Sequence, residues 1–142
     1  MMRLLSLRAF ACDRGGASAV EFGLIAPVLA LMLVGIAEVG RVAYQRTDMH
    51  SALRSGGQYV LNGGRDLAAA REIVIRSWTA MPEDAVVEAT RFCLCGETQH
   101  ACNSPCAGGS VPEAYISLRA HATLGGIVVD YGSSADDAIR IR

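Results

Sequence analysis

Residues 17–40 read ASAVEFGLIAPVLALMLVGIAEVG, and no charged side chain occurs between Phe22 and Ala37. As an α-helix this stretch would extend about 36 Å at 1.5 Å per residue, slightly more than the roughly 30 Å of a bilayer's hydrocarbon layer. A secretory signal peptide has a shorter apolar region, so removal near Gly35 and Ala37 is the weaker alternative. We therefore predict a transmembrane helix over residues 17–40.

The flanks of this segment predict its orientation. Residues 1–16 form a short basic leader with Arg3, Arg8 and Arg14 opposed only by Asp13, while two arginines follow the segment. This slight bias favours a cytoplasmic N-terminus. Residues 41–142 would then form one small domain on the other side of the membrane, outside the cytoplasm.

Overall composition sets limits on function. The chain has 142 residues, 51% of them hydrophobic, with 13 basic and 14 acidic side chains. This charge balance excludes a strongly basic nucleic-acid binder. The length left beyond the apolar segment suffices for one small core and excludes a large multi-domain enzyme.

Two residues are unusual for a simple anchor. Glu21 places a carboxylate inside the apolar segment, where it costs roughly 2.5 to 3.5 kcal/mol at mid-membrane and less near the surface. It either finds a partner or reaches the headgroups. Pro27 removes a backbone hydrogen bond and invites a kink or local melting, although membrane helices often tolerate proline.

The junction from Arg14 reads RGGASAVEFGLIAP: a basic leader, Gly16, and Glu21 as the fifth residue after that glycine. This pattern resembles a type IV prepilin junction. The Glu21-Phe22 pair and the later sequence EVGR at residues 38–41 are similar to the TadE-like family of minor pilins, or pseudopilins, of the Tad tight-adherence pilus. The resemblance covers about residues 14–61.

The resemblance implies a processing and assembly role. A prepilin peptidase would cut between Gly16 and Ala17, and a small residue at the first position suits a protease that holds the backbone closely. The new amine on Ala17 would meet the Glu21 carboxylate of a neighbouring subunit, with Phe22 in the aromatic position beside it. The implied partners are the prepilin peptidase, other Tad pilins and minor pilins, the inner-membrane assembly platform and membrane lipid. The implied role is pilus assembly or adhesion.

Helical periodicity continues beyond the apolar segment. One stripe of apolar residues predicts that the same long helix emerges from the membrane: Val42, Met49, Leu53 and Val60. Residues 62–64 (Asn-Gly-Gly) would end it, and Asp66 would cap a second helix that Pro82 closes. The apolar positions of this second helix are Leu67, Ala70, Val74 and Trp78, all expected in the core.

Strands follow from Asp84 onward. Apolar and polar residues alternate over 115–124, which predicts a strand with one buried face. Val86 to Cys95 is predicted as its antiparallel neighbour, and Ile139 and Ile141 indicate a short last strand. Residues 125–137 could be strand or packed loop. The predicted fold class is α+β, pilin-like, with an antiparallel sheet.

Four cysteines gather in the segment 93–106: Cys93, Cys95, Cys102 and Cys106. In an oxidising compartment they would pair. Of the three connectivities we prefer the nested one, which joins Cys95 to Cys102 and Cys93 to Cys106. A zinc site of four thiolates, or three with His100, is the alternative, although its spacing departs from the usual CxxC pairs.

No enzymatic motif is present in the sequence. His50 and His121 have no evident acid or nucleophile beside them, and Asp136 and Asp137 are typical of a solvated turn. We expect no catalytic residue, no metal and no cofactor. The leading hypothesis is a cleaved Tad pilin-like subunit, and the alternative is an uncleaved single-pass periplasmic protein with a cysteine-rich domain that binds zinc or a ligand.

Overall fold

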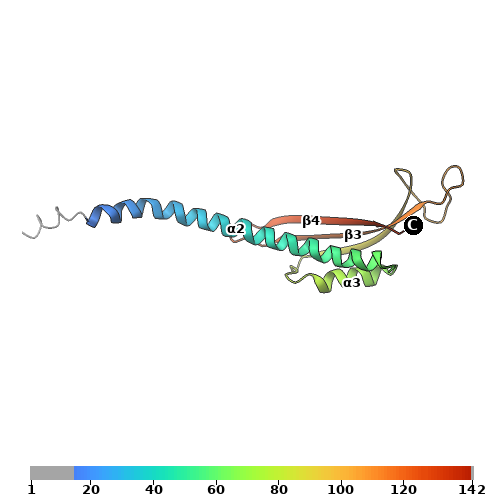
Figure 1. Cartoon of the computed structure of the whole chain (residues 1–142), viewed down its shortest axis with the longest axis horizontal. Coiled ribbons are helices and arrows are strands. Elements are labelled where there is room, and N and C mark those ends of the chain that lie inside the picture. Colours follow the sequence, from blue (N-terminus) through green and yellow to red (C-terminus); the bar gives the residue numbers. More distant parts are fainter. Residues whose placement is uncertain (1–14, 142) are drawn as a thin grey trace, which may run out of the picture. The chain divides into compact units, whose positions relative to one another are not determined.

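The computed structural model describes residues 15–141 and has the predicted α+β class (Figure 1). Two helices precede four strands: α2 (Gly15–Leu61), α3 (Leu67–Ser77), β1 (Val86–Cys95), β2 (Thr98–His100), β3 (Glu113–Leu124) and β4 (Tyr131–Arg140). The chain divides into two compact units, with the boundary between Glu38 and Val39.

Helix α2 is one uninterrupted element that contains both the apolar segment and the stripe beyond it, as predicted. It continues through Pro27, so the local melting considered there does not occur. The Asn-Gly-Gly signal ends the helix: the backbone amides of Gly63 and Gly64 donate to the carbonyls of Val60 and Tyr59. Gly63 adopts a φ of 92°, a conformation that favours glycine.

Helix α3 begins at its predicted cap but ends earlier than expected. The Asp66 carboxylate accepts from the amides of Ala68 (2.9 Å) and Ala69 (3.4 Å). The prediction that Pro82 closes the helix is wrong, because Trp78 already has an extended backbone. The Asp48 carboxylate of α2 accepts from the amide of Ala80 at 2.8 Å and holds the departing chain.

The sheet is antiparallel throughout, in the order β2-β1-β3-β4. Val86 to Cys95 is the predicted strand and pairs with β3 as expected. The short last strand predicted around Ile139 is wrong in extent, since β4 starts at Tyr131 and pairs with β3 along its length. Its polar residues obscure the alternation, as expected of an edge strand that backbone hydrogen bonds hold to its neighbour.

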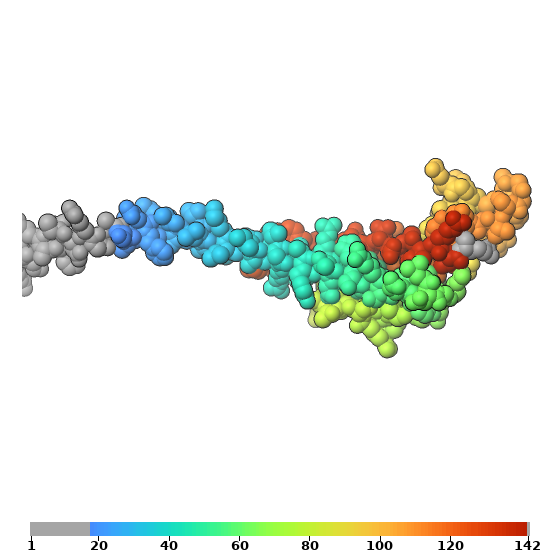
Figure 2. All heavy atoms as spheres, in the orientation of Figure 1, coloured from blue at the N-terminus to red at the C-terminus, as the bar shows by residue number. Residues whose placement is uncertain are grey.

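One face of the sheet carries the core. Alternate residues of β3 from Ala114 to Leu124 are buried, and so are Ala135 and Ile139 of β4. The C-terminal part of α2 and helix α3 cover this face (Figures 1 and 2). Most helical residues predicted from the stripes lie in this core: Met49, Leu53, Val60, Ala70, Val74 and Trp78. Val42 and Leu67, also predicted, are only partly buried, and Ala52 is buried without having been predicted.

The opposite face of the sheet is not covered by a helix. Phe92 of β1 stacks on Tyr115 of β3 with ring centroids 5.3 Å apart. The Tyr115 hydroxyl donates to Glu113 (2.8 Å), which raises the pKa of Tyr115, and Glu113 also pairs with Arg140 of β4 at 2.9 Å. The result is a second, more polar surface across β1, β3 and β4.

The turn before β1 is tied to the far end of β3. The Asp84 carboxylate accepts from the backbone amide of Thr123 at 2.9 Å. Hydrogen bonding to Thr123 holds the pKa of Asp84 below its usual value, because the bond favours the charged form. This contact fixes the point at which the chain enters the sheet.

Gly56 provides a test of the helix packing. A Cβ at this position would lie 2.5 Å from a Val74 methyl group and 2.9 Å from one of Leu118. We expect Gly56→Ala to lower the free energy of unfolding, because overpacking costs about 1 to 3 kcal/mol and the gain in helix propensity is only about 0.5 to 1 kcal/mol. Denaturant unfolding of the full chain in detergent micelles measures this change.

Gly40→Ala is the matched control in the same helix. A Cβ there would meet nothing within 4 Å. It should leave stability unchanged or slightly higher. Equal effects of the two substitutions would contradict the packing of α2 described above.

Candidate functional site

The N-terminal part of α2 exposes apolar side chains on every side. Successive large residues have between 43% and 73% of their surface exposed, from Val20 to Val39. Such a helix belongs either in lipid or among other helices. By length and composition, α2 is the one helix among the described residues that can cross a membrane, and none of its most apolar window is buried.

Glu21 and Phe22 lie on this exposed surface. Phe22 is 69% exposed, and the side chain of Glu21 is also exposed. Within residues 18–141, neither an ion pair nor a hydrogen bond of Glu21 is present. Glu38, the other acid in the TadE-like pattern, is only 8% exposed. Among the acidic residues of α2, Glu21 is therefore the one whose side chain is exposed in the described part of the chain.

Gly16 and Ala17 lie in the first turn of α2. The side chain of Ala17, and all of the leader before Gly15, are outside the described part of the structure. Pro27 is exposed within the helix, six residues beyond Glu21. Its ring cannot donate to the carbonyl of Gly23, and a Cβ at Gly23 would meet nothing within 4 Å. The backbone here is open to close approach by another molecule.

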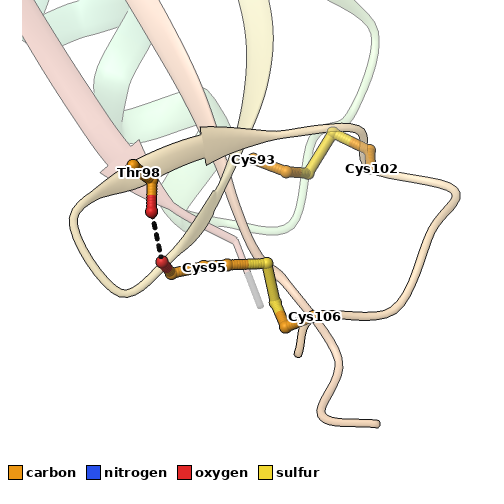
Figure 3. Close-up of a disulfide and its surroundings, with 5 residues drawn as sticks. All are labelled: Cys93, Cys95, Thr98, Cys102 and Cys106. Carbon is orange, nitrogen blue, oxygen red and sulfur yellow. Dashed lines mark hydrogen bonds between the residues drawn. A yellow bond between two sulfur atoms is a disulfide. The ribbon is translucent and has the colours of Figure 1, made fainter. Parts of the chain in front are cut away.

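The four clustered cysteines form two disulfides, as expected, but the nested pairing is wrong (Figure 3). Cys93 pairs with Cys102 and Cys95 with Cys106, with Cα atoms 5.2 and 5.7 Å apart. The reason is a hairpin that the sequence analysis did not predict. Strand β2 returns along β1 from Thr98, opposite Cys95, to His100, opposite Cys93, so Cys102 arrives beside Cys93.

The missed hairpin has a recognisable signal. Gly96 and Glu97 form a two-residue connection between the paired residues Cys95 and Thr98, and Gly96 has a φ of 67°. A glycine at the first position of a two-residue turn is typical of tight hairpins. The Thr98 hydroxyl also donates to the Cys95 carbonyl at 3.0 Å (Figure 3).

The zinc alternative depends on thiolates, and all four sulfurs are engaged in disulfides here. His50 and His121 are exposed and His100 is partly buried.

Asp136 and Asp137 are not in a turn as expected but in β4, where successive side chains face opposite sides of the sheet. Asp136 lies opposite Arg119 of β3, and Asp137 opposite Leu118.

Comparison with known proteins bears on α2. Residues 16–58 match the family model described as TadE-like protein. This region of the chain is TadE-like. The match confirms the resemblance inferred from residues 14–61. No curated protein and no solved structure matches the chain. The TadE-like region includes the exposed apolar surface, Glu21 and the core residues Met49 and Leu53, and it ends before α3 and the sheet.

Paired double substitutions test the disulfide connectivity. Cys93→Ser/Cys102→Ser removes one observed bond and should leave Cys95 and Cys106 paired, with no new free thiol. Cys93→Ser/Cys106→Ser removes one partner from each bond and should expose two thiols to alkylation without reductant. Cys12, the fifth cysteine of the chain, contributes the same background of alkylation to both variants. Two free thiols in the first double variant and none in the second would instead show that the nested pairing is correct.

Proposed function

We propose that this chain is a minor pilin or pseudopilin of a Tad-type pilus or secretion system, processed by prepilin peptidase. It would be anchored in the bacterial inner membrane by α2, with its N-terminus cytoplasmic and residues 41–142 in the periplasm. The observation that carries this proposal is the TadE-like helix, apolar and exposed all round, with one exposed acid near its start.

Processing would remove residues 1–16 by cleavage between Gly16 and Ala17. The position in the first turn of α2 supports this, because the first amides of a helix lack intrahelical partners and the end frays readily. Unwinding one turn would present the backbone to the peptidase. The product carries a free amine on Ala17, with a reference pKa near 8, so it is mostly protonated at neutral pH.

Glu21 would receive that amine from a neighbouring subunit. An ionised carboxylate among Val20, Phe22 and Leu24, all exposed, is costly in lipid unless paired. Pairing with an ammonium group of the next subunit neutralises both charges. Because each helix has one such acid and one such amine, the pair also sets how far one subunit is displaced along the next.

Assembly would exchange lipid for protein around the same surface. The exposed apolar residues contact lipid while the subunit waits in the membrane, and they contact other Tad pilin helices after extraction. Packing of helices in lipid depends on close van der Waals contact, so this exchange has little net cost. The assembly platform would drive the extraction. The role is structural, without catalysis.

The sheet and the disulfide loop would supply contacts outside the helical bundle. The open sheet face and residues 94–111 are not part of the core and remain accessible for neighbours or for adhesion. The two disulfides join cysteines that are 9 and 11 positions apart in the sequence. Each would stabilise this segment by about 2 to 3 kcal/mol.

Cleavage is tested by the intact mass of the chain from cells with and without a prepilin peptidase. We expect a mature chain beginning at Ala17 only when the peptidase is present. Gly16→Val should block processing, because a branched side chain obstructs the cleavage site, whereas Ser18→Ala two residues beyond should not. A chain that keeps its leader in peptidase-containing cells would support the uncleaved alternative and reject the proposal.

The role of Glu21 is tested by measuring how much of each variant subunit is incorporated into sheared pili. Glu21→Ala and Glu21→Gln should insert into the membrane normally but fall by about tenfold or more in incorporation, since an ion pair in lipid is lost. Glu21→Asp retains the charge and should recover part of the loss, and Ser18→Ala is the neutral control. Normal incorporation of Glu21→Gln would refute the proposed pairing.

A further inference from the structure

The connection between β3 and β4 exposes a run of apolar side chains. Ile127, Val128 and Val129 have 54%, 71% and 54% of their surface exposed. Connections between strands are usually rich in polar and turn-forming residues, and a contiguous exposed apolar patch commonly marks a contact with a partner or a membrane. Three consecutive β-branched residues here need an explanation.

A hydrogen bond fixes where this connection lies. The Gln45 side chain of α2 donates from Nε2 to the carbonyl of Gly125 at 3.3 Å. Gln45 is five residues past Gly40, where the apolar segment ends, so it lies only about 7.5 Å along the helix from that point. Val128 is three residues from Gly125, a reach of at most about 11 Å. The connection therefore lies at the end of the unit formed by residues 39–142 at which α2 enters it.

The side chains around it have the composition of a membrane interface. Tyr44 of α2 and Tyr131 at the start of β4 are 65% and 43% exposed. Arg41 and Arg46 are exposed on the same stretch of helix. Tyrosine rings and arginines are enriched where a protein meets the headgroups, because each combines an apolar body with a polar end.

We propose that residues 127–129 insert into the headgroup boundary of the bilayer that holds α2. The partner is lipid rather than protein because the connection lies near Gly40, where the apolar segment ends, and because exposed tyrosines and arginines of the kind found at a membrane interface occur beside it. Asp130 is exposed directly after the patch, and its carboxylate limits insertion to the boundary. The inference depends on the membrane anchoring proposed above, but not on cleavage at Gly16.

Such a contact would give the periplasmic unit a second attachment. Helix α2 alone leaves that unit free to tilt and to rotate about the helix axis. Insertion of the β3–β4 connection would remove much of this freedom and present the disulfide loop, at the other end of β3, away from the membrane. The pool of unassembled subunits would then share one orientation.

Tryptophan quenching by brominated lipids tests the proposal with the full chain. The natural chain has a single tryptophan, Trp78, whose side chain is buried, and its signal provides the background. Val128→Trp is compared with Val111→Trp, an equally exposed valine beyond the opposite end of β3. Leu31→Trp in the apolar segment reports whether α2 spans. All are reconstituted in phosphatidylcholine and phosphatidylglycerol vesicles, brominated either near the headgroup or deep in the chain.

We expect Val128→Trp to lose intensity and shift to the blue with lipids brominated near the headgroup, and Val111→Trp to match the background. Leu31→Trp should be quenched most by deep bromines. Ile127→Trp should repeat the result if the substitution at 128 disturbs the connection.

Two results would overturn the inference while leaving the anchor intact. With Leu31→Trp quenched, Val128→Trp and Ile127→Trp no more quenched than Val111→Trp would place the connection outside lipid. A blue shift at 128 without quenching would mean that protein covers it. An unquenched Leu31→Trp would instead remove the membrane anchor, and both proposals with it.

Discussion

The structure depends on a helix whose first half is apolar on every side and has no cover within its own unit. The large apolar residues from Val20 to Val39 have between 43% and 73% of their surface exposed. Burial of apolar surface is the dominant favourable term in folding and association, so this half must obtain its stabilisation from lipid or from other helices. The pairing proposed for Glu21 would lower the cost of its charge in such surroundings.

The second half of the same helix has the opposite relation to the protein. Met49, Leu53 and Val60 are buried against α3 and the sheet, and Gly56 allows a methyl group of Val74 to approach closely. The change from the exposed half to the buried half occurs within one continuous helix. The TadE-like region includes the first half and the second half up to residue 58, whereas the sheet and its disulfides lie outside it. The proposed assembly surface is thus in the part of the chain that the family model matches, and the sheet is not.

The sequence predicts the elements whose signals are periodic and local. The stripe ending at Val60, the Asp66 cap and the alternation over 115–124 all correspond to observed elements, because buried faces impose helical and strand periods. Strand β4 was missed since Ser133 and Asp137 occupy positions on its inner side, where apolar residues would have revealed the alternation. The disulfide pairing failed for a single cause: the Gly96 turn reverses the chain and brings Cys102 to Cys93. For the site, local sequence was enough to single out Glu21 and Phe22, but the proximity of Gly125 to Gln45 is a contact between residues 80 positions apart.

The continuity of α2 has a mechanical consequence. During the extraction proposed above, a force applied to α2 would reach the core through the part of the helix that is packed in it. The contact between α2 and the sheet would then carry this load in shear, distributed over Met49, Leu53 and Val60 together rather than concentrated on one residue.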